Sequence, residues 1–322
     1  MAGPQPSSAV TRPDLRDSVY DEWDKAGELA NYRGAMLCPI ADVPTRSGTY
    51  KKIDREEFIK AKDTARRTGS YPTTVFGYTE ANYNTKERGH QVAVEDSMAA
   101  EAAQYFDAEI EAAELALLIV NREFEKDCIS LITGAGVTQT SAVTAAFSSH
   151  STATPIADIR TASEAIWKST GRWPNMVCMG KEAYGDLREC DEIIDKLGAF
   201  NSDDFKRPSD PLLAKIFDVA EVIVHQGLKD SADKGQTASL AVMWPVGTVL
   251  VGYVDPAPTL QGRHGLTLSR TLHWTGDDSE RNFRTEEYYD EATRTRYIRA
   301  RRHEKIELVE ELCGYRLTGA HA

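Results

Sequence analysis

The stretch Asp107–Thr133, DAEIEAAELALLIVNREFEKDCISLIT, decides the fold, because it reads as one long α-helix. Its apolar residues recur at steps of three and four, the spacing that lines one face of a helix. The members of this face are Ile110, Ala113, Leu117, Val120, Phe124, Cys128 and Leu131. We expect Ile110, Leu117, Val120 and Phe124 to form the core of this spine helix, where burial of each large side chain contributes roughly 1.5–3 kcal/mol.

The middle of this helix is apolar in every direction. Leu115, Ala116, Leu118 and Ile119 fill the positions between those of the first face. A helix of this kind must be covered on more than one side, and one sheet of a single domain would leave part of it bare. The apolar run is six residues long, whereas a membrane span needs about twenty. We therefore expect a buried helix that anchors the fold and any subunit contacts, and no membrane segment.

No motif for a catalytic, cofactor or metal site stands out. The seven histidines include no H-E-x-x-H and no pair at ligand spacing. Thr133–Gly136 superficially resembles a phosphate-binding loop, but it follows a helix rather than a strand, so we interpret Gly134-Ala135-Gly136 as a helix terminator. Cys128 and Cys178 lie in apolar strings and are interpreted as inert core thiols. The sequence predicts no catalytic residue and no cofactor.

The chain has 322 residues and an ordinary amino-acid composition, and it is long enough for one large or two moderate domains. A net charge of −12 argues against sequence-dependent nucleic-acid binding, which needs an excess of Lys and Arg on the contacting face. That charge does not exclude a protein that encloses DNA. The five cysteines contain no C-x-x-C pair, so a reducing cytoplasm fits best. The N-terminus has no apolar h-region, and we expect no signal peptide.

The segment before about residue 42 is rich in Pro, Ser and charge and then carries scattered apolar anchors. These anchors are Val19, Tyr20, Trp23, Leu29 and Tyr32. We predict an arm with one short helix around Ser18–Ala30 that lies on another part of the protein. The alternative, a frayed tail, suits Met1–Pro13.

The composition changes from Arg46 to about Val94, where large aliphatic residues are few. GTYKKID opens this region and HQVAVED closes it, both with strand-like alternation, and turn signals lie between them. The pattern predicts a long two-stranded excursion. Because such a hairpin is marginal alone in water, we expect it to lean on a neighbour.

Two regions carry opposite charge. Arg46–Ser70 holds eight Lys and Arg against four acids, and Gln91–Leu131 holds ten acids against two basic residues. The hairpin of one subunit could therefore lie over the helical region of another, with charge setting register more than affinity; two solvated faces are the alternative. The candidate intersubunit contacts are Trp23, Lys51, Lys52, Arg55, Lys60, Arg66, Arg67, Tyr71, Phe76, Tyr78, Glu109, Glu111 and Glu114.

The rest of the chain mixes single strands and helices, which indicates an α+β or α/β block. Val137–Ala153 reads as a loop. Helices are expected after Thr154 as N-cap up to Gly171, then at Glu182–Leu187, Asp191–Leu197 and Leu212–Phe217, the last with Asp210 as N-cap. Strands are expected in Asn175–Met179, in AEVIVHQGL and on both sides of Pro245-Val246-Gly247. From Leu266 onward, LTLSRTLHW, a hairpin turning at Asp290–Thr293 and a terminal strand KIELVEELCGYRL should return to the long helix.

The order of these elements resembles that of the major capsid proteins of tailed bacteriophages, of the Hong Kong 97-type fold. The resemblance rests on the arm, the basic loop, the long helix ending in glycine, and the segments GRWPNMVCMG, DPLLAKIFDVAEVIV, LAVMWPVGTVLVGY and GYRL. Single motifs are weak, but their order and spacing from Asp42 to Leu317 are specific. The resemblance implies an α+β chain divided into an N-terminal arm (1–41), an extended loop (42–94), a peripheral domain with the spine helix (95–174), an axial domain (175–258) and return strands of the peripheral domain (259–322).

The resemblance also implies a structural role with no catalytic turnover. Subunits of the family form hexamers and pentamers that close into an icosahedral shell around double-stranded DNA, in the virion capsid, after assembly in the host cytoplasm. A separate scaffolding protein and a portal are the expected partners, because only about forty residues precede the loop, and a decoration protein is compatible with this role. Lys51, Lys52, Lys60 and Lys62 would be available as amines for intersubunit crosslinking, but no partner residue is identifiable.

Two alternatives remain. An encapsulin-like nanocompartment would share the fold and enclose a cargo enzyme in place of a genome. A soluble α+β enzyme with an unrecognised site is the alternative of another class, and it is motivated only by the strand and helix block at Asn175–Asp255.

Overall fold

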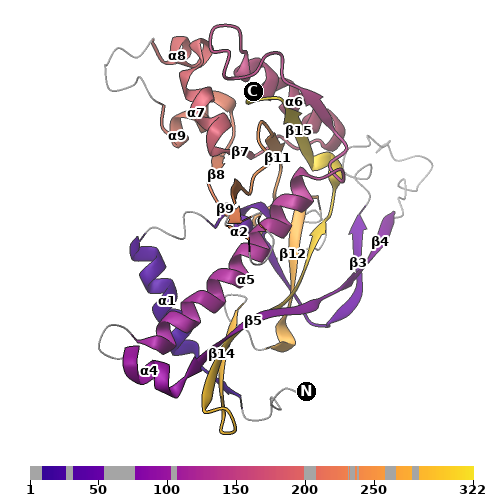
Figure 1. Ribbon diagram of the computed structural model, residues 1–322. Coiled ribbons are helices and arrows are strands. Elements are labelled where there is room, and N and C mark those ends of the chain that lie inside the picture. The colour runs from indigo at the N-terminus through magenta and orange to yellow at the C-terminus, as the bar shows by residue number, and fades with distance from the viewer. Residues whose placement is uncertain are drawn as a thin grey trace, which may run out of the picture.

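The computed structural model describes residues 9–26, 32–53, 77–102, 107–198, 208–230, 232, 236–237, 239–257, 266–277 and 283–322. Helix α5 (Ala108–Thr133) runs obliquely through the molecule, with one β-sheet near each of its ends (Figure 1). Its bounds match the predicted spine helix. Asp107 caps it by accepting a hydrogen bond from the Glu109 amide at 2.9 Å. Gly134 ends it, because a Cβ at this position would lie 2.6 Å from the Ser130 carbonyl oxygen.

The first sheet lies against the N-terminal part of α5. Its strand order is β1 (Val10–Thr11), β13 (Arg284–Asp290), β14 (Thr295–Leu308), β12 (Ser269–Trp274) and β2 (Ile40–Val43), and β5 (Lys86–Glu95) also pairs with β14. All pairs are antiparallel except β12 with β2. The 14-residue strand β14 is therefore shared by three neighbours.

The second sheet forms the other end of the molecule. Its strand order is β6 (Thr140–Ala142), β15 (Gly314–Thr318), β11 (Val249–Gly252), β7 (Met176–Gly180) and β8 (Glu221–His225). Helices α6 (Pro155–Thr170), α7 (Lys181–Glu189), α8 (Asp191–Gly198) and α9 (Asp210–Phe217) accompany it. Helix α6 ends as predicted at Gly171, whose φ of 71° suits glycine. Helix α9 begins at Asp210 with Ser209 as N-cap, one residue before the predicted cap.

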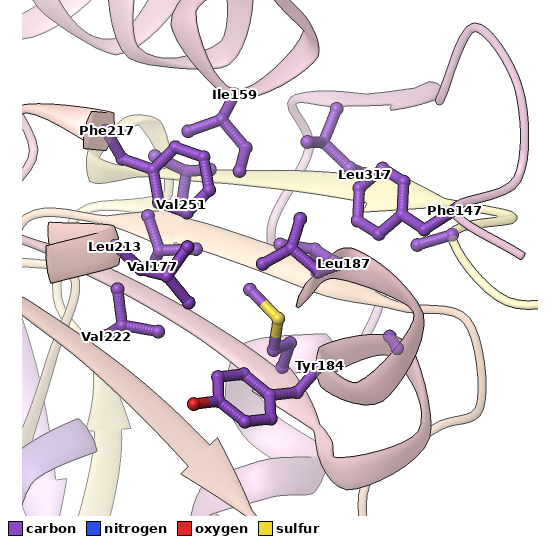
Figure 2. Packing of buried hydrophobic residues seen from close by; sticks show 14 of the residues in the cluster. Phe147, Ile159, Val177, Tyr184, Leu187, Leu213, Phe217, Val222, Val251 and Leu317 are labelled. Carbon is purple, nitrogen blue, oxygen red and sulfur yellow. The ribbon is translucent and has the colours of Figure 1, made fainter. Parts of the chain in front are cut away.

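The second sheet is buried on both faces, which explains its continuous apolar strands. Val177 and Val251 face the helices, where they pack with Ile159, Leu187 and Leu213 (Figure 2). On the other face, a separate cluster joins the sheet to the C-terminal half of α5 and consists of residues such as Cys128, Ile129, Ile132, Cys178 and Leu250. Alternation along the strands thus sends successive side chains to opposite cores.

The N-terminal arm packs on α5. Helix α1 (Pro13–Ala26) starts five residues before the predicted Ser18, and its buried residues Leu15 and Val19 join Ala113 and Leu117 in one cluster. The short helix α2 (Gly34–Leu37) follows and also contacts α5. The predicted docked arm is confirmed over its described residues.

The predicted pairing of the excursion was wrong. Strand β3 (Ser47–Ile53), which contains GTYKK, pairs with β4 (Tyr78–Asn84) and not with HQVAVED. HQVAV lies in β5, which pairs with β14 over its whole length. The physical reason is burial. Val92 and Val94 pack into the apolar cluster formed with α1 and α5, whereas pairing with a polar hairpin would give these side chains no apolar partners.

The predicted terminal strand was also wrong, because KIELVEELCGYRL is divided between the two sheets. Lys305–Leu308 closes β14, a 3₁₀ turn covers Glu311–Cys313, and β15 then pairs with β11. The amides of Val309 and Glu310 bond to Leu268 and Thr267 carbonyls, which turns the chain away from the first sheet. The hairpin turn after Asp290 is confirmed, and Val137–Ala153 contains the short strand β6 in addition to loop.

The remaining elements are α4 (Asp96–Ala102), the two-stranded ribbon of β9 (Leu228–Asp230) and β10 (Leu240–Val242), and a 3₁₀ turn at Thr275–Asp277. Within the described ranges, none of the helices combines the length and the apolar character that crossing a bilayer requires.

Candidate assembly surfaces

Helix α5 is covered on one side and open on another. Leu117 is fully buried, Val120 and Phe124 are buried, and Ile110 is half-buried. On the outer side, Leu115 remains 46% exposed. The chain's own described residues therefore cover the predicted core face, but they leave part of the apolar middle of the helix accessible to another molecule.

The acids of α5 divide between internal and external positions. Glu109 pairs with Arg296 of β14 and lies 3.7 Å from the Arg12 guanidinium. Glu114 accepts a hydrogen bond at 2.9 Å from Trp23 Nε1. Glu111 is exposed. Of these three candidate contacts, Glu111 is the one whose carboxylate has no partner among the described residues.

Trp23 lies inside the subunit. It is 3% exposed, packs against the rings of Tyr20 and Tyr32 at centroid distances of 5.6 and 5.9 Å, and donates to Glu114. Its position ties α1 to α5. The sequence made Trp23 a candidate intersubunit contact because its segment lacks a core of its own, but in the structure α5 of the same subunit supplies that core.

The β3–β4 hairpin carries its two lysines in different settings. Lys51 is exposed, lies 4.2 Å from the Tyr78 ring centroid and 3.7 Å from Glu80 on the neighbouring strand. The pKa of Lys51 is raised by its contacts with Tyr78 and Glu80. Tyr78 itself is 51% exposed. This cationic and aromatic face of the hairpin is turned toward solvent.

Lys52 joins the hairpin to its own subunit. Its ammonium lies 2.9 Å from Glu310 and donates to the Val309 carbonyl at 2.6 Å, at the corner that follows β14. Beside it, Tyr50 packs on a small apolar cluster with Tyr83, and burial raises the pKa of Tyr50 to about 12. The base of the hairpin is thus fixed to the first sheet.

Several predicted contacts lie outside the described residues. They are Arg55, Lys60, Arg66, Arg67, Tyr71 and Phe76, and the crosslinking candidate Lys62 lies outside as well.

A buried carboxylate and imidazole in hydrogen-bond contact connect the two ends of the fold. Glu125 of α5 lies 2.8 Å from His225 Nε2 of β8, and both side chains are 1% exposed. The same carboxylate accepts hydrogen bonds from the amides of Arg33 and Gly34 at 2.8 and 2.6 Å, at the start of α2. These four groups satisfy one another away from water. Sequence reasoning missed the cluster, because its members are about a hundred positions apart and share no motif.

A second buried pair lies under the first sheet. Arg302 and Glu304 of β14 form an ion pair at 2.5 Å, and the Arg302 guanidinium lies 3.8 Å from the Phe124 ring centroid. Burial raises the pKa of the Glu304 carboxyl, and Arg302 opposes that shift. Arg302 also faces the ring of Phe283 at 4.4 Å, so the cation is held between two aromatic rings.

The cysteines are all free and buried, as the apolar strings around Cys128 and Cys178 predicted. Burial raises the pKa of both of these thiols, which disfavours the reactive thiolate. Among the described residues, no group of three or more His, Cys, Asp or Glu side chains is arranged to hold a metal ion.

Hollows mark the surface of the described residues, and one of them, about 460 Å³, lies between β5 and α5 and includes Gly89, Val120 and Arg302. A larger one, of about 730 Å³, lies between α1, α5 and the β9–β10 ribbon and includes Trp23, Leu118 and Leu228. A hollow of about 690 Å³ lies between the hairpin and α5 and includes Tyr83, Asp127 and Lys305. Another, of about 350 Å³, follows strand β8 between α7 and α9.

Comparison with known proteins assigns the fold. No family model and no curated protein matches the sequence. Among solved structures, a phage-related protein from Bordetella bronchiseptica RB50 is 19% identical with a TM-score of 0.71, and the match covers 98% of this chain and 99% of that one. The capsid of the cyanophage P-SCSP1u is 12% identical with a TM-score of 0.55, covering 89% and 87%. A virus-like particle from Pyrococcus furiosus is 12% identical with a TM-score of 0.55, covering 95% and 98%.

At these levels of sequence identity, the similarity establishes the fold. The chain has the α+β Hong Kong 97-type capsid fold over nearly its whole length. The resemblance indicated by the sequence motifs is confirmed at that level.

Proposed function

We propose that this chain is the structural subunit of a closed protein shell, a major capsid protein that assembles as hexamers and pentamers around double-stranded phage DNA. The observation that carries the proposal is the fold, which matches a phage capsid and a virus-like particle over most of each chain. The open apolar and charged surfaces around Leu115, Lys51 and Tyr78 support it, because a shell subunit needs such surfaces for its neighbours.

In this proposal, the first sheet with α1, α4 and α5 is the peripheral domain. The second sheet with α6 to α9 is the axial domain, so β6, α6 and β15 belong to it and not to the peripheral ranges 95–174 and 259–322 that the resemblance implied. The β3–β4 hairpin begins the extended loop that reaches a neighbouring subunit. The partners are other copies of the chain, a separate scaffolding protein, a portal and packaged DNA held without sequence-specific contacts. The location is the virion capsid, after assembly in the host cytoplasm. The net charge of −12 fits such a shell, because mild repulsion does not trap the packaged DNA.

Negative-stain electron microscopy and light scattering of the protein expressed alone test the proposal. Closed shells, or sheets of hexamers, are the expected result. If the protein is monomeric, the same measurements are repeated after co-expression with a candidate scaffolding protein. A protein that stays monomeric in both experiments contradicts the proposal.

A further inference from the structure

Strand β8 leaves one edge of the second sheet unpaired among the described residues. It is the last strand in the order and pairs only with β7, in parallel register from Met176 opposite Glu221 to Gly180 opposite His225. The Glu221 amide donates to the Asn175 carbonyl. Because backbone groups alternate along a strand, the amides and carbonyls of Val222 and Val224 point away from β7.

The open edge forms one wall of a groove. The hollow of about 350 Å³ is lined by consecutive residues of this strand, Ala220–Val224, and by side chains of α7 and α9 such as Tyr184 and Pro211. Figure 2 shows Tyr184 and Val222 at this end of the helix-covered core. Along this run Ala220 and Glu221 are exposed and Val224 is half-buried, whereas Val222 and Ile223 are buried, so the edge is accessible at its start and at Val224.

The lining of the groove holds three basic side chains, Arg33, Lys181 and Arg188, against the two acids Asp210 and Glu221. Lys181 and Arg188 lie on either side of Tyr184, at 5.6 and 5.3 Å from its ring centroid, and Arg33 lies on the lining as well. Neither Lys181 nor Arg188 forms an ion pair with any residue in the described part of the chain. Asp210 is engaged by the Tyr184 hydroxyl, and Glu221 is the remaining acid of the lining. The lining therefore favours carboxylates.

Among the residues that the structure describes, the strand lacks the usual protection of an open edge. Proteins blunt edge strands with prolines, bulges, lysines or a covering element. EVIVH contains no proline and no lysine, and its ladder with β7 is regular. An unprotected edge in a groove of fixed charge is suited to receiving an extended peptide by strand addition.

We propose that an extended, carboxylate-bearing segment of a second copy of this chain docks on the β8 edge in the groove between α7 and α9. This inference rests on the proposed function. The charge supports a second copy as the occupant, because the chain carries 50 acids against 38 basic residues and the groove presents Lys181, Arg188 and Arg33. A head-to-tail contact of this kind between unlike surfaces gives a ring where the rotation between subunits closes, and an open filament where it does not.

Amide hydrogen exchange tests the proposal directly. Residues Ala220–His225 are followed by mass spectrometry in isolated subunits and in empty shells. The Glu221, Ile223 and His225 amides should be protected in both states, and the Val222 and Val224 amides should gain protection only in shells. Shells in which Val222 and Val224 exchange as fast as in free subunits overturn the proposal. Protection that appears only in DNA-filled shells would also overturn it, because nucleic acid would then be the occupant.

A pair of variants separates the backbone from the side chain. Val224→Pro removes an amide that points away from β7, a position where an edge strand tolerates proline, whereas Val224→Ala keeps that amide. We expect the proline variant to need roughly tenfold more subunit for half-maximal assembly than the alanine variant, as for the loss of about one to two hydrogen bonds. Equal assembly of two folded variants contradicts the proposal.

Charge reversal gives a second route that does not alter the strand. Lys181→Glu should weaken assembly, and Lys215→Glu is the matched control, because Lys215 is exposed on the neighbouring helix α9 and does not line the groove. Equal assembly of these two variants also contradicts the proposal.

If the unaltered protein forms no shells under any condition, the proposed function fails. If it forms normal shells in which the β8 edge is unprotected from exchange, only the docking site is excluded.

Discussion

The Glu125 carboxylate lies 2.8 Å from His225 Nε2, at a point where both side chains are shielded from water. It joins the spine helix α5 to the edge strand β8, and through the amides of Arg33 and Gly34 it also fixes the start of α2. One carboxylate thus links three segments that are distant in sequence.

Removing this carboxylate should destabilise the subunit strongly. We expect Glu125→Ala to lower the free energy of unfolding by about 3–5 kcal/mol, because the His225 ring and the amides of Arg33 and Gly34 lose a shared acceptor and each unsatisfied buried group costs about 1–3 kcal/mol. Glu125→Gln should cost less, since its amide oxygen still accepts a hydrogen bond. Denaturant unfolding of the isolated subunit measures both values. Glu111→Gln, at an exposed position on the same helix, is the control and should change the value by less than about 0.5 kcal/mol. Equal effects at the two positions would contradict the role of the cluster.

Leu115 and Leu117 provide a test of fold against assembly. Leu117→Asp should abolish folding, because the side chain is fully buried between α5 and its neighbours. Leu115→Asp, at a side chain that is 46% exposed, should leave the circular dichroism spectrum and melting temperature close to those of the unaltered protein. The same change should reduce shell formation, as measured by light scattering. Normal shells from the Leu115 variant would exclude the open side of α5 from subunit contacts.

The two lysines of the hairpin should behave differently. Lys51→Glu is expected to leave the subunit folded and to impair assembly, with an effect that weakens as salt screens the charges. Lys52→Glu should act inside the subunit, because it places a second carboxylate against Glu310 at the corner after β14. Limited proteolysis of the hairpin in the isolated subunit distinguishes them, and only the Lys52 variant should be cut faster. Assembly of the Lys51 variant that equals that of the unaltered protein at low and high salt would contradict an intersubunit role for this charge.

Glu286 should make the first sheet sensitive to acid. Burial alone would raise the pKa of this carboxyl, but hydrogen bonds and charge from Arg301 and Arg299 outweigh it, so the pKa is held below its usual value. A carboxyl with a depressed folded-state pKa contributes stability that is fully present above the unfolded pKa of about 4.3 and is lost as pH falls through the folded value. The difference in melting temperature between the unaltered subunit and Glu286→Gln should therefore be large at pH 7 and shrink below about pH 4. A difference that does not change with pH would contradict this account.

The elements with local signals could be predicted from the sequence. The spine helix was predicted from its periodicity and its stop at Gly134, and α6 from Thr154 and Gly171. The cap at Asp107 was not recognised. These signals act within a few residues of each element, so no distant partner was needed to recognise them.

The errors arose where distant parts of the chain decide the structure. HQVAVED has the alternation of a strand, but nothing in it shows that its partner β14 lies about two hundred positions away. The division of KIELVEELCGYRL likewise depends on Thr267 and Leu268, whose carbonyls receive the amides that turn the chain. The charged candidates were selected by composition alone. Composition could not separate Lys51, which faces solvent, from Lys52, which is bound to Glu310.

The way in which the hairpin joins β5 determines how the subunit would bear mechanical load. Only Thr85 separates β4 from β5, and β5 is paired with β14 from Lys86 opposite Glu304 to Glu95 opposite Thr295. A force that pulls the hairpin along the strand direction therefore loads the β5–β14 ladder in shear. The hydrogen bonds of the ladder lie across the strands, so they must break together and not one after another. The hairpin is thus attached to the subunit by its most force-resistant geometry, and tension on it would pass directly into the strand that three others share.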